Sequence, residues 1–435
     1  MIWLAGCAPA PLCPDAGGAG PNLVVVVLDD VGLDKIGRYG VHPVTAPTPT
    51  FDQLASEGLL YRDAYALPSC TATRAALLNG RHARRTGTGS ILWPFDGSAE
   101  LPLDEVTIPE LLRPAGYCSA IAGKWHLSTL LSPSGARHPW GQGFAWYSGS
   151  LNNLWVDTAR RSGGNGYYAF EKVGMDGEIA LEERYATTDT TDDAIALVHT
   201  LPSPFFLMVS YNAAHNPWHD PPAALQGYGT GLDPFTSQLA MLEAADAELA
   251  RLVDVLPDDT VLVLLSDNGS SSSVAQPPSD PERAKNTVYE GGIRVPMVVT
   301  GPGVPAGVET HALFSVVDLL PTFAELAGAA LPDVPLDGVS ALPTWRDPAV
   351  EVRGSVYAEE LSPAGPGPWV VDERSLRDDR YKLVRHTDGA VELFDLLGRT
   401  FDEGEDLLLS PTPEAEAALD RLTAALDATV DDLTR

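Results

Sequence analysis

The chain has 435 residues, 44% of them apolar, and a formal net charge of −31 from 59 acidic residues against 28 Lys and Arg. This length and apolar content predict a globular protein with a large buried core and two or three domains. The acidic excess argues against a nucleic-acid partner, because binding to phosphates requires clustered cations. No stretch reaches the roughly 18 consecutive apolar residues that a membrane-spanning helix needs.

Residues 1–20 have the composition of a tether. LAGC at 4–7 resembles the lipobox of bacterial lipoproteins, with Cys7 as the lipidated residue, and a stretch rich in Pro, Gly and Ala follows it. The charged start and most of the apolar part of a signal peptide are missing, so the match is either the remnant of a longer signal or chance. We favour the remnant and expect a periplasmic or cell-envelope lipoprotein, tethered to the membrane through Cys7.

Apolar strands alternate with helices over residues 21–345. The unbroken β-branched run NLVVVVL at 22–28 is typical of a strand buried on both faces. Helices are expected at 51–60 and 236–256, and further strands at 117–123, 204–212, 260–269 and 295–303. This alternation predicts an α/β fold with a large mixed, mostly parallel sheet flanked by helices.

The pattern changes after residue 345. Short strands of alternating polarity with hairpin-like joins are expected within 354–360, 369–386 and 391–399, and a final helix at about 412–434. Residues 346–435 are therefore predicted to form a smaller subdomain with an antiparallel sheet.

The stretch PSCTATRAALLNGR at 68–81 places a cysteine at the start of a short predicted helix. Cys70 would lie near the unpaired N–H groups of the helix N-terminus, where a nucleophile could meet an anion. The alternative is an inert buried cysteine. The four cysteines of the chain are too few for a disulfide framework, and they show no metal-ligand spacing. The basic residues that follow are either the rim of an anion site or a solvated turn; they are Arg81, His82, Arg84 and Arg85.

Oxygen-bearing side chains follow two of the predicted strands. Asp29 and Asp30 come directly after the first strand, and Asp267 and Asn268 lie at the end of the strand expected at 260–269. In an open α/β sheet, ligands bind beyond the carboxyl ends of the strands. Without a cation the three carboxylates would repel one another, and an all-oxygen set suits Ca²⁺ or Mg²⁺. The alternative is that these residues only start turns or cap helices.

Six motifs in order resemble the type I sulfatases of the alkaline phosphatase superfamily, and the chain is arylsulfatase-like over nearly its whole length. The motifs are LDD at 28–30, CTATR at 70–74, GKWHL at 123–127, AHNPW at 214–218, SDNG at 266–269 and KNTVYEGGIRVP at 285–296. The resemblance implies an alkaline phosphatase-like catalytic domain and hydrolysis of a sulfate ester.

The resemblance also implies a role for each matched position. Cys70 would be oxidised to Cα-formylglycine, whose hydrate is the nucleophile. One divalent metal, Ca²⁺ with Mg²⁺ as the alternative, would be held by Asp29, Asp30, Asp267, Asn268 and the modified Cys70. Arg74 and His126 would hold the hydrate, and Lys124, His215 and Lys285 would bind the sulfate. His215 or Lys285 would assist the leaving oxygen. Lys124 and His126 are expected to share a face of an extended segment.

The CTATR motif departs from the family's commonest signature at two positions, where Ala72 and Thr73 replace the usual proline and serine. Ala72 stands where the family usually has proline, and the maturase that reads this proline acts with oxygen. A radical-type maturase tolerates alanine, so we expect that enzyme as the partner.

The segment 128–185 is expected to shape the pocket for a sulfated small molecule or saccharide. Its aromatic residues either stack on a sugar or aryl ring or pack in the core; they are Trp140, Trp146, Trp155, Tyr167 and Tyr168. A carbohydrate sulfate is the first expectation and an aryl sulfate the second. The competing functions are a phosphonate or phosphate diester hydrolase of the same superfamily, and a non-catalytic binding protein if Cys70 stays a thiol.

Overall fold

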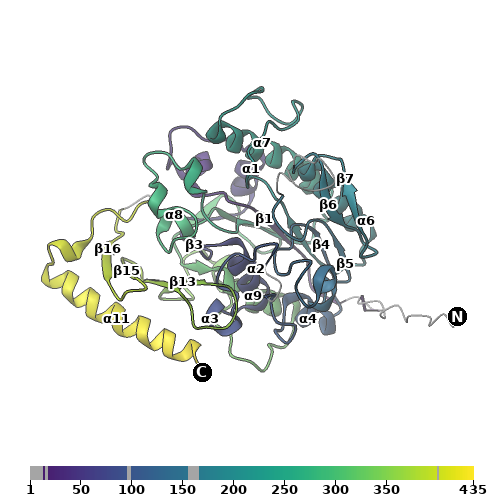
Figure 1. Ribbon diagram of the computed structural model, residues 1–435. Helices are drawn as coiled ribbons and strands as arrows, with labels where there is room; N and C mark the ends of the chain where they lie inside the picture. The colour runs from purple at the N-terminus through teal and green to yellow at the C-terminus, as the bar shows by residue number, and fades with distance from the viewer. Residues whose placement is uncertain (1–12, 15–17, 96–98, 155–165, 399–400) are drawn as a thin grey trace.

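The computed structural model describes residues 13–14, 18–95, 99–154, 166–398 and 401–435 (Figure 1). The strands of its larger part are β1 (Asn22–Leu28), β2 (Leu59–Tyr61), β3 (Ala64–Tyr65), β4 (Cys118–Gly123), β5 (Trp146–Ser148), β6 (Phe170–Val173), β7 (Ile179–Glu182), β8 (Phe205–Ser210), β9 (Thr260–Ser266), β10 (Met297–Thr300), β11 (Val308–Thr310) and β12 (Phe314–Ser315). The helices of this part are α1 (Pro49–Glu57), α2 (Cys70–Asn79), α3 (Ala83–Thr86), α4 (Ile108–Leu112), α5 (His138–Gly141), α6 (Ala186–Thr200), α7 (Pro234–Val253), α8 (Glu290–Ile293), α9 (Leu319–Ala327) and α10 (Leu342–Arg346).

A central sheet of eight strands has the order β11-β2-β10-β9-β1-β8-β4-β5. The pairs from β9 to β5 are parallel, β10 is antiparallel to both of its neighbours, and β11 is parallel to β2. All seven residues of β1 are buried, as its β-branched run predicts. The predicted mixed, mostly parallel sheet is therefore confirmed.

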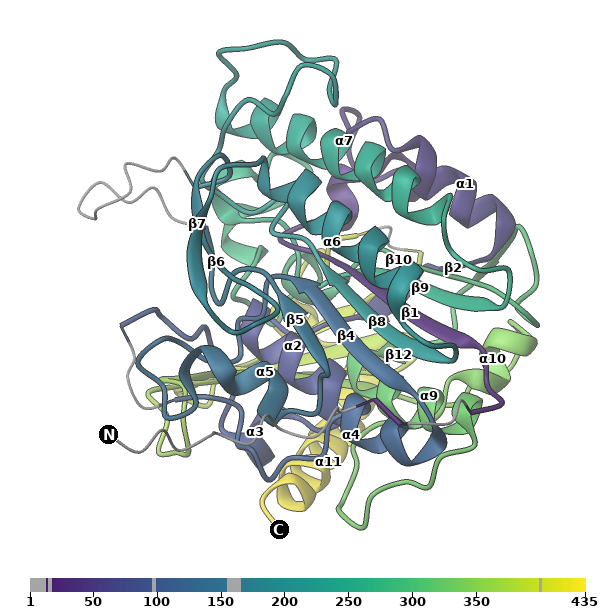
Figure 2. The ribbon, with the colours of Figure 1, turned by 90° about the vertical axis from the view of Figure 1, so that its right-hand side faces the viewer.

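Helices cover both faces of this sheet (Figure 2). One face packs against α1, α6 and α7, where Leu54, Leu197 and Leu239 join one core cluster. The other face packs against α2, α4 and α9 in a second cluster. The helix predicted at 51–60 ends earlier than expected, because Gly58 breaks it and the following residues form β2.

The C-terminal subdomain is an antiparallel sheet covered by one helix, as predicted. Its strands have the order β13-β14-β15-β16, and they are β13 (Val356–Ser362), β14 (Val371–Arg377), β15 (Tyr381–Arg385) and β16 (Val391–Asp395). Helix α11 (Pro413–Leu433) packs its leucines on this sheet in a separate core cluster. No observation here tests the boundary predicted between residues 345 and 346, which stays a prediction.

The basic residues after α2 form ion pairs with other segments of the chain. Arg81 pairs with Glu105, Arg84 with Glu359 of β13, and Arg85 with both Asp337 and Asp432. His82 is buried. The arginines of this cluster are paired with carboxylates from other segments of the chain. Neither alternative drawn from the sequence, an anion-binding rim or a solvated turn, therefore describes it.

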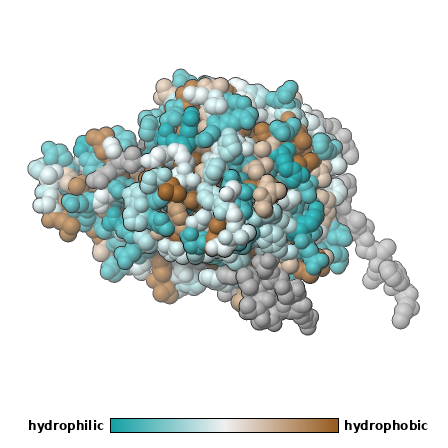
Figure 3. All heavy atoms as spheres, turned by 90° about the horizontal axis from the view of Figure 1, so that it is seen from above, coloured by the Kyte–Doolittle hydropathy of each residue, from teal (hydrophilic) through white to brown (hydrophobic). Residues whose placement is uncertain are grey.

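One disulfide joins Cys13 to Cys118 at the start of β4, across a sequence separation of 105 residues. The cysteine spacing gave no sign of it. The lipobox match at 4–7 lies outside the described residues. Among the helices that the structure describes, none is both long and apolar enough to cross a membrane. On the face shown in Figure 3, hydrophobic residues form small separate groups among hydrophilic ones, as the acidic composition leads one to expect.

Candidate functional site

The candidate site lies beyond the carboxyl ends of four adjacent strands, β9, β1, β8 and β4. Asp29 directly follows β1, Asp267 directly follows β9 and Lys124 directly follows β4. His215 lies in the loop after β8. Because β1 pairs in parallel with both β8 and β9, their ends meet at the same edge of the sheet. The fold therefore brings these predicted site residues together. The strand positions predicted this for Asp29 and Asp267, and the family resemblance implied it for Lys124 and His215.

The four oxygen-bearing residues are buried, and hydrogen bonds join three of them. The Asn268 amide donates a hydrogen bond of 2.8 Å from Nδ2 to Asp30 Oδ1, and the Asp30 backbone N–H donates one of 3.3 Å to Asp267 Oδ1. The Asn268 Oδ1 atom is buried and has no hydrogen-bond partner among the described residues. A buried amide oxygen without a donor needs another partner, and a cation would be one.

Cys70 faces this cluster from the first residue of α2. Its Sγ atom lies 3.5 Å from Asp29 Oδ1 and 3.9 Å from Asp30 Oδ1. Burial, together with the Asp267 carboxylate, raises the pKa of the thiol well above its ordinary value. The thiol therefore stays protonated at neutral pH and is a poor nucleophile as it stands.

Three buried cations offset the carboxylates. Arg74 Nη2 lies 2.8 Å from Asp267 Oδ2, Lys124 pairs with Asp29, and Lys285 Nζ lies 2.5 Å from Asp30 Oδ1. Lys285 Nζ also lies 3.2 Å from Cys70 Sγ. Burial opposes ionisation of Asp29 and Asp30, but the neighbouring groups, with Lys124 foremost at Asp29 and Lys285 at Asp30, together hold both pKa values below the usual range.

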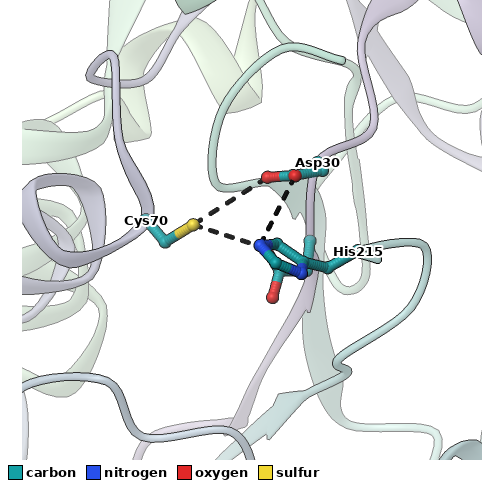
Figure 4. Close-up of side chains that lie close together, drawn as sticks. Asp30, Cys70 and His215 are labelled. Carbon is teal, nitrogen blue, oxygen red and sulfur yellow. Dashed lines mark hydrogen bonds and ion pairs between the residues drawn. The ribbon is translucent and has the colours of Figure 1, made fainter. Parts of the chain in front are cut away.

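The two predicted histidines are also in the site. His215 Nε2 lies 3.7 Å from Asp30 Oδ2, and Figure 4 shows His215, Asp30 and Cys70 turned toward one another. Burial lowers the pKa of His215, and burial with the Lys124 charge lowers that of His126, so both rings are neutral at pH 7. The prediction of an extended segment is wrong at His126, whose φ of 61° lies in the left-handed region. The alternation of side chains along a strand therefore does not determine where the His126 side chain lies.

The donor set fits a hard divalent cation. Asp29, Asp30, Cys70 and His215 offer ligand atoms that all lie within 4.8 Å of one another. The predicted ligands Asp267 and Asn268 add a carboxylate and the unpartnered amide oxygen beside them. Carboxylate and amide oxygens are the ligands that Ca²⁺ and Mg²⁺ prefer. The sequence analysis placed His215 in the same site but gave it a different role, in binding the sulfate.

Two further residues support the site: Thr71, which escaped prediction, and Tyr167, for which core packing was one of the two alternatives. Thr71 donates to the His126 carbonyl and accepts from the Leu92 N–H, at 3.1 Å each, so it fixes the loop over the site. Tyr167 is buried, and its hydroxyl donates to the carbonyl of His215 at 2.7 Å. Tyr167 thus positions the histidine loop rather than facing solvent for stacking. No spacing in the sequence distinguishes such residues from ordinary core residues.

The other aromatic candidates divide between core, surface and loop. Trp140 packs beside Tyr147 on the core, and Trp146 is exposed on the edge strand β5. Tyr168 is partly buried and donates from its hydroxyl to the carbonyl of Asp220 at 2.7 Å. Trp155 lies outside the described residues.

Comparison with known protein families and solved structures gives a consistent result. The sulfatase family profile matches residues 21–329, and the profile of the N-sulphoglucosamine sulphohydrolase C-terminal region matches residues 283–430. Human arylsulfatase A is 35% identical over 396 residues, which cover 85% of this chain and 76% of the human protein. Rat N-acetylgalactosamine-6-sulfatase is 32% identical over 359 residues, covering 74% of this chain and 65% of the rat protein.

Solved structures extend the likeness to the whole chain. The crystal structure of Ps i-CgsB in complex with k-i-k-neocarrahexaose has a TM-score of 0.79 and 27% identity, with 94% of this chain and 92% of that one covered. The structure of BT4656 with D-glucosamine-2-N,6-O-disulfate has a TM-score of 0.74 over 95% of this chain, but its 21% identity bears on the fold alone.

Proposed function

Because the chain belongs to the sulfatase family and is a sulfuric ester hydrolase, we propose that it releases inorganic sulfate from a sulfated saccharide through a formylglycine hydrate at position 70. The observation that carries the proposal is the position of Cys70, which lies between the carboxylate cluster and Lys285. A metal and a formylglycine are typical of the family.

The state of the thiol supports conversion of Cys70. A buried thiol with a raised pKa among carboxylates is a poor nucleophile. A cysteine S-sulfonate also has no second hydroxyl from which to expel sulfate. The aldehyde hydrate supplies one oxygen for attack on sulfur and a second hydroxyl, whose deprotonation breaks the bond to the sulfate and regenerates the aldehyde.

Calcium is the proposed metal, and Asp29, Asp30, Asp267 and Asn268 would hold it together with the hydrate. When bound, the cation would withdraw charge from the sulfate oxygens. The unpartnered Oδ1 of Asn268 supports this assignment. Mg²⁺ is the alternative, since its ligand chemistry is similar.

The basic side chains around Cys70 support a sulfate site. Lys124, His215 and Lys285 would bind the sulfate oxygens, and Arg74 and His126 would orient the hydrate. Lys285 carries a proton over the whole working range, because the neighbouring Asp30 carboxylate raises its pKa against the effect of burial. His215 is neutral. A proton for the leaving oxygen is thus available from Lys285 Nζ, whereas the neutral His215 ring carries its proton on Nδ1, which donates to the Asn216 carbonyl at 2.6 Å.

The substrate class rests on the relatives. Ps i-CgsB, with 27% identity over nearly the whole chain, was solved with a neocarrahexaose, which favours a sulfated saccharide. Human arylsulfatase A, with 35% identity, keeps an aryl sulfate as the second candidate. The maturation partner is a radical-type maturase, since Ala72 replaces the proline that the oxygen-dependent enzyme reads.

The cellular location is proposed from the N-terminus. A lipid on Cys7 would hold the protein in the periplasm or at the cell envelope. The Cys13–Cys118 disulfide supports this location, because disulfides persist in oxidising compartments. Fractionation of the native host tests it, and recovery of the protein from the cytosol alone would contradict it.

The experiment that tests the function is a substrate panel. Protein co-expressed with a radical-type maturase is incubated with sulfated saccharides, aryl sulfates and phosphate diesters, and released sulfate and phosphate are measured. We expect sulfate release from at least one saccharide, and none from Cys70→Ala. Hydrolysis of phosphate diesters without any sulfate release would overturn the proposal.

A further inference from the structure

The side chains of strand β15 in the C-terminal sheet point alternately to two different neighbours. Leu383 lies in the core cluster of helix α11, and Arg385 Nη1 lies 2.6 Å from a carboxylate oxygen of that helix. Because alternate residues of a strand face the same side, Lys382 and Val384 point the other way. Figure 1 shows β15 between α8 and α11. One face of the sheet therefore meets α11, and the other meets the part of the chain around α8.

Lys382 is joined to the start of α8 by buried ion pairs. Its Nζ atom lies 2.9 Å from Glu290 Oε1 and 3.1 Å from Glu403 Oε1, and each of the three side chains is only 1% exposed. The Glu403 carboxylate also accepts the backbone N–H of Glu290, and Glu290 Oε2 accepts the Tyr65 hydroxyl at 2.8 Å. A lysine of the C-terminal sheet thus fixes the first residue of α8.

The residues before α8 pack on the same face of the sheet. Val288 and Val384 are both buried, and with Phe394 of β16 they form a small core cluster of their own. Tyr289 packs against this cluster, and its hydroxyl donates to Glu392 of β16. Residues 288–290 are therefore held by the sheet through apolar packing, a hydrogen bond and ion pairs.

A second contact lies on the other side of Lys285 in the sequence. The Arg283 guanidinium lies 5.1 Å from the centre of the Phe394 ring, and its Nη1 donates to the Gly404 carbonyl at 3.3 Å. Lys285 comes two residues after Arg283 and three before Val288. The C-terminal part of the chain therefore holds the segment 283–290 on both sides of this site lysine.

Lys285 itself spans from this segment to the catalytic cluster. The residue after it, Asn286, has a φ of 69°, in the left-handed region that residues other than glycine seldom adopt. The N–H of Asn286 donates to the Pro68 carbonyl at 2.8 Å, two residues before Cys70. A backbone in such a conformation persists when the surrounding structure holds it. At the other end of the side chain, Lys285 Nζ contacts Asp30 and Cys70.

We infer that the C-terminal sheet positions Lys285 for the sulfate, with Lys382 and Val384 as positioning residues that act through the segment 283–290. The inference rests on the proposed function, because that function assigns the sulfate to Lys285. Asp30 would also hold the metal ion, so its contact with the amine does not by itself fix Lys285, and the sheet supplies the constraint on the backbone. Neither positioning residue touches the reacting atoms.

The first test measures local opening and does not depend on activity. Lys382→Met leaves two buried carboxylates without their cation, and Val384→Ala removes two methyl groups from the packing against Val288. In both variants, amide hydrogen exchange over residues 283–293 should accelerate at least about tenfold more than exchange in β9. Equal acceleration in the two regions would indicate only a general loss of stability and would overturn the inference. Val384→Ala carries the test if Lys382→Met does not fold.

Matched controls change the opposite face of the same sheet. Arg385→Met removes a β15 cation that pairs with α11, and Val391→Ala shortens a β16 valine that packs in the cluster of α11. Both controls should change exchange over residues 283–293 by less than about twofold. If they accelerate it as much as Lys382→Met and Val384→Ala do, the face that meets α8 has no special role and the inference is wrong.

The second test asks whether the positioning residues act through Lys285. Sulfate release from N-acetylgalactosamine 6-sulfate and p-nitrophenyl sulfate is measured, with rates divided by the aldehyde fraction of the peptide Asp63–Arg74. Val384→Ala should lower kcat/KM about tenfold when Lys285 is present, because small displacements of a binding group are costly. In the Lys285→Met background it should cost less than about twofold.

The same fold-loss in both backgrounds would overturn the inference, since a residue that only stabilises the fold acts whether or not Lys285 is present. If wild type releases sulfate from no ester at all, the proposed function fails, and the exchange test then decides whether the sheet holds the segment 283–290. Wild-type exchange over that segment in both Lys382→Met and Val384→Ala would overturn the inference on its own.

Discussion

Both Nε and Nη2 of Arg74 donate to the same oxygen of Asp267, at 3.1 and 2.8 Å. A further Arg74 nitrogen, Nη1, donates to the Lys124 carbonyl and to Ser210. This fully buried arginine therefore ties the ends of β9, β4 and β8 to helix α2. It neutralises one carboxylate of the cluster while the other oxygen of that carboxylate, Oδ1, accepts from Asp30.

Arg74→Met should be strongly destabilising as well as inactive. Removing one partner of a buried ion pair leaves an uncompensated charge, which costs about 3–5 kcal/mol of unfolding free energy. The double variant Arg74→Met/Asp267→Asn should recover part of this loss but none of the activity. Urea denaturation of the wild type, both single variants and the double variant measures the coupling. Strictly additive losses would contradict the pairing.

The carboxylate cluster predicts that a divalent ion stabilises the folded protein. Binding to the folded state alone adds about 2.7 kcal/mol when the free ion is at 100 times its dissociation constant. Chelator-treated protein should therefore gain thermal stability when Ca²⁺ is added, and Asn268→Ala should lose most of that gain. Asp258→Asn changes an exposed acid and is the control. Equal gains in all three proteins would mean that Ca²⁺ binds elsewhere.

His82 predicts a loss of stability in acid. Burial lowers the pKa of His82 to about 4, against the opposing effect of Asp337, and its ring packs edge-on against Tyr357 at 5.0 Å. Because the pKa of His82 is lowered by folding, below about pH 6.5 the unfolded chain binds a proton that the folded protein does not bind. The contribution of neutral His82 to the unfolding free energy is thus fully present above pH 6.5, and it falls by about 3 kcal/mol as the pH approaches 4.

His82→Phe isolates this effect, because phenylalanine keeps the ring contact and cannot be protonated. Between pH 7 and pH 4, the variant should lose about 3 kcal/mol less unfolding free energy than wild type, as measured by urea denaturation at each pH. Carboxylates that titrate in the same range are common to both proteins and cancel in the difference. Parallel curves would show that His82 has the same pKa in the folded and unfolded states, which would contradict the prediction.

The strand ends of the site were predictable because apolar runs and their following residues are local in the sequence. The sequence predicts two buried strands with carboxylates at the same edge of the sheet, from NLVVVVL followed by Asp29 and from TVLVLLS followed by Asp267. The contributions of the C-terminal sheet were not predictable. Arg84 and Glu359 are 275 residues apart in the sequence, and they meet only after the C-terminal sheet has packed against the rest of the chain.

The left-handed turn at His126 was not predictable either. The φ of 61° at His126 follows a glycine, Gly123, that is also in the left-handed region with a φ of 101°. A Cβ at Gly123 would lie 2.1 Å from the Ser210 carbonyl oxygen, so the close approach of β8 requires glycine there. The motif GKWHL contains this glycine and the left-handed turn, but neither follows from local sequence patterns without the resemblance to other proteins.

The last prediction concerns the maturation of Cys70 and turns on Ala72. Cys70 is the first residue of α2, so Ala72 is the third, and the first intrahelical bond after the cap runs from the Thr73 N–H to the Ser69 carbonyl at 3.0 Å. The N–H of Ala72 has no acceptor within the helix, and a proline there removes no hydrogen bond of the helix.

Ala72→Pro should therefore fold and should restore the signature that a proline-reading maturase recognises. In a host with only that maturase, we expect wild type to be largely unconverted and nearly inactive, and Ala72→Pro to carry a larger aldehyde fraction on Asp63–Arg74 by mass spectrometry. Turnover should rise in proportion to that fraction. Cys70→Ser and Cys70→Ala should keep the fold and lose turnover, because neither yields an aldehyde without a serine-tolerant maturase. Full turnover by protein whose Cys70 is an intact thiol would overturn the formylglycine mechanism, since a thiol has no second hydroxyl with which to release the sulfate.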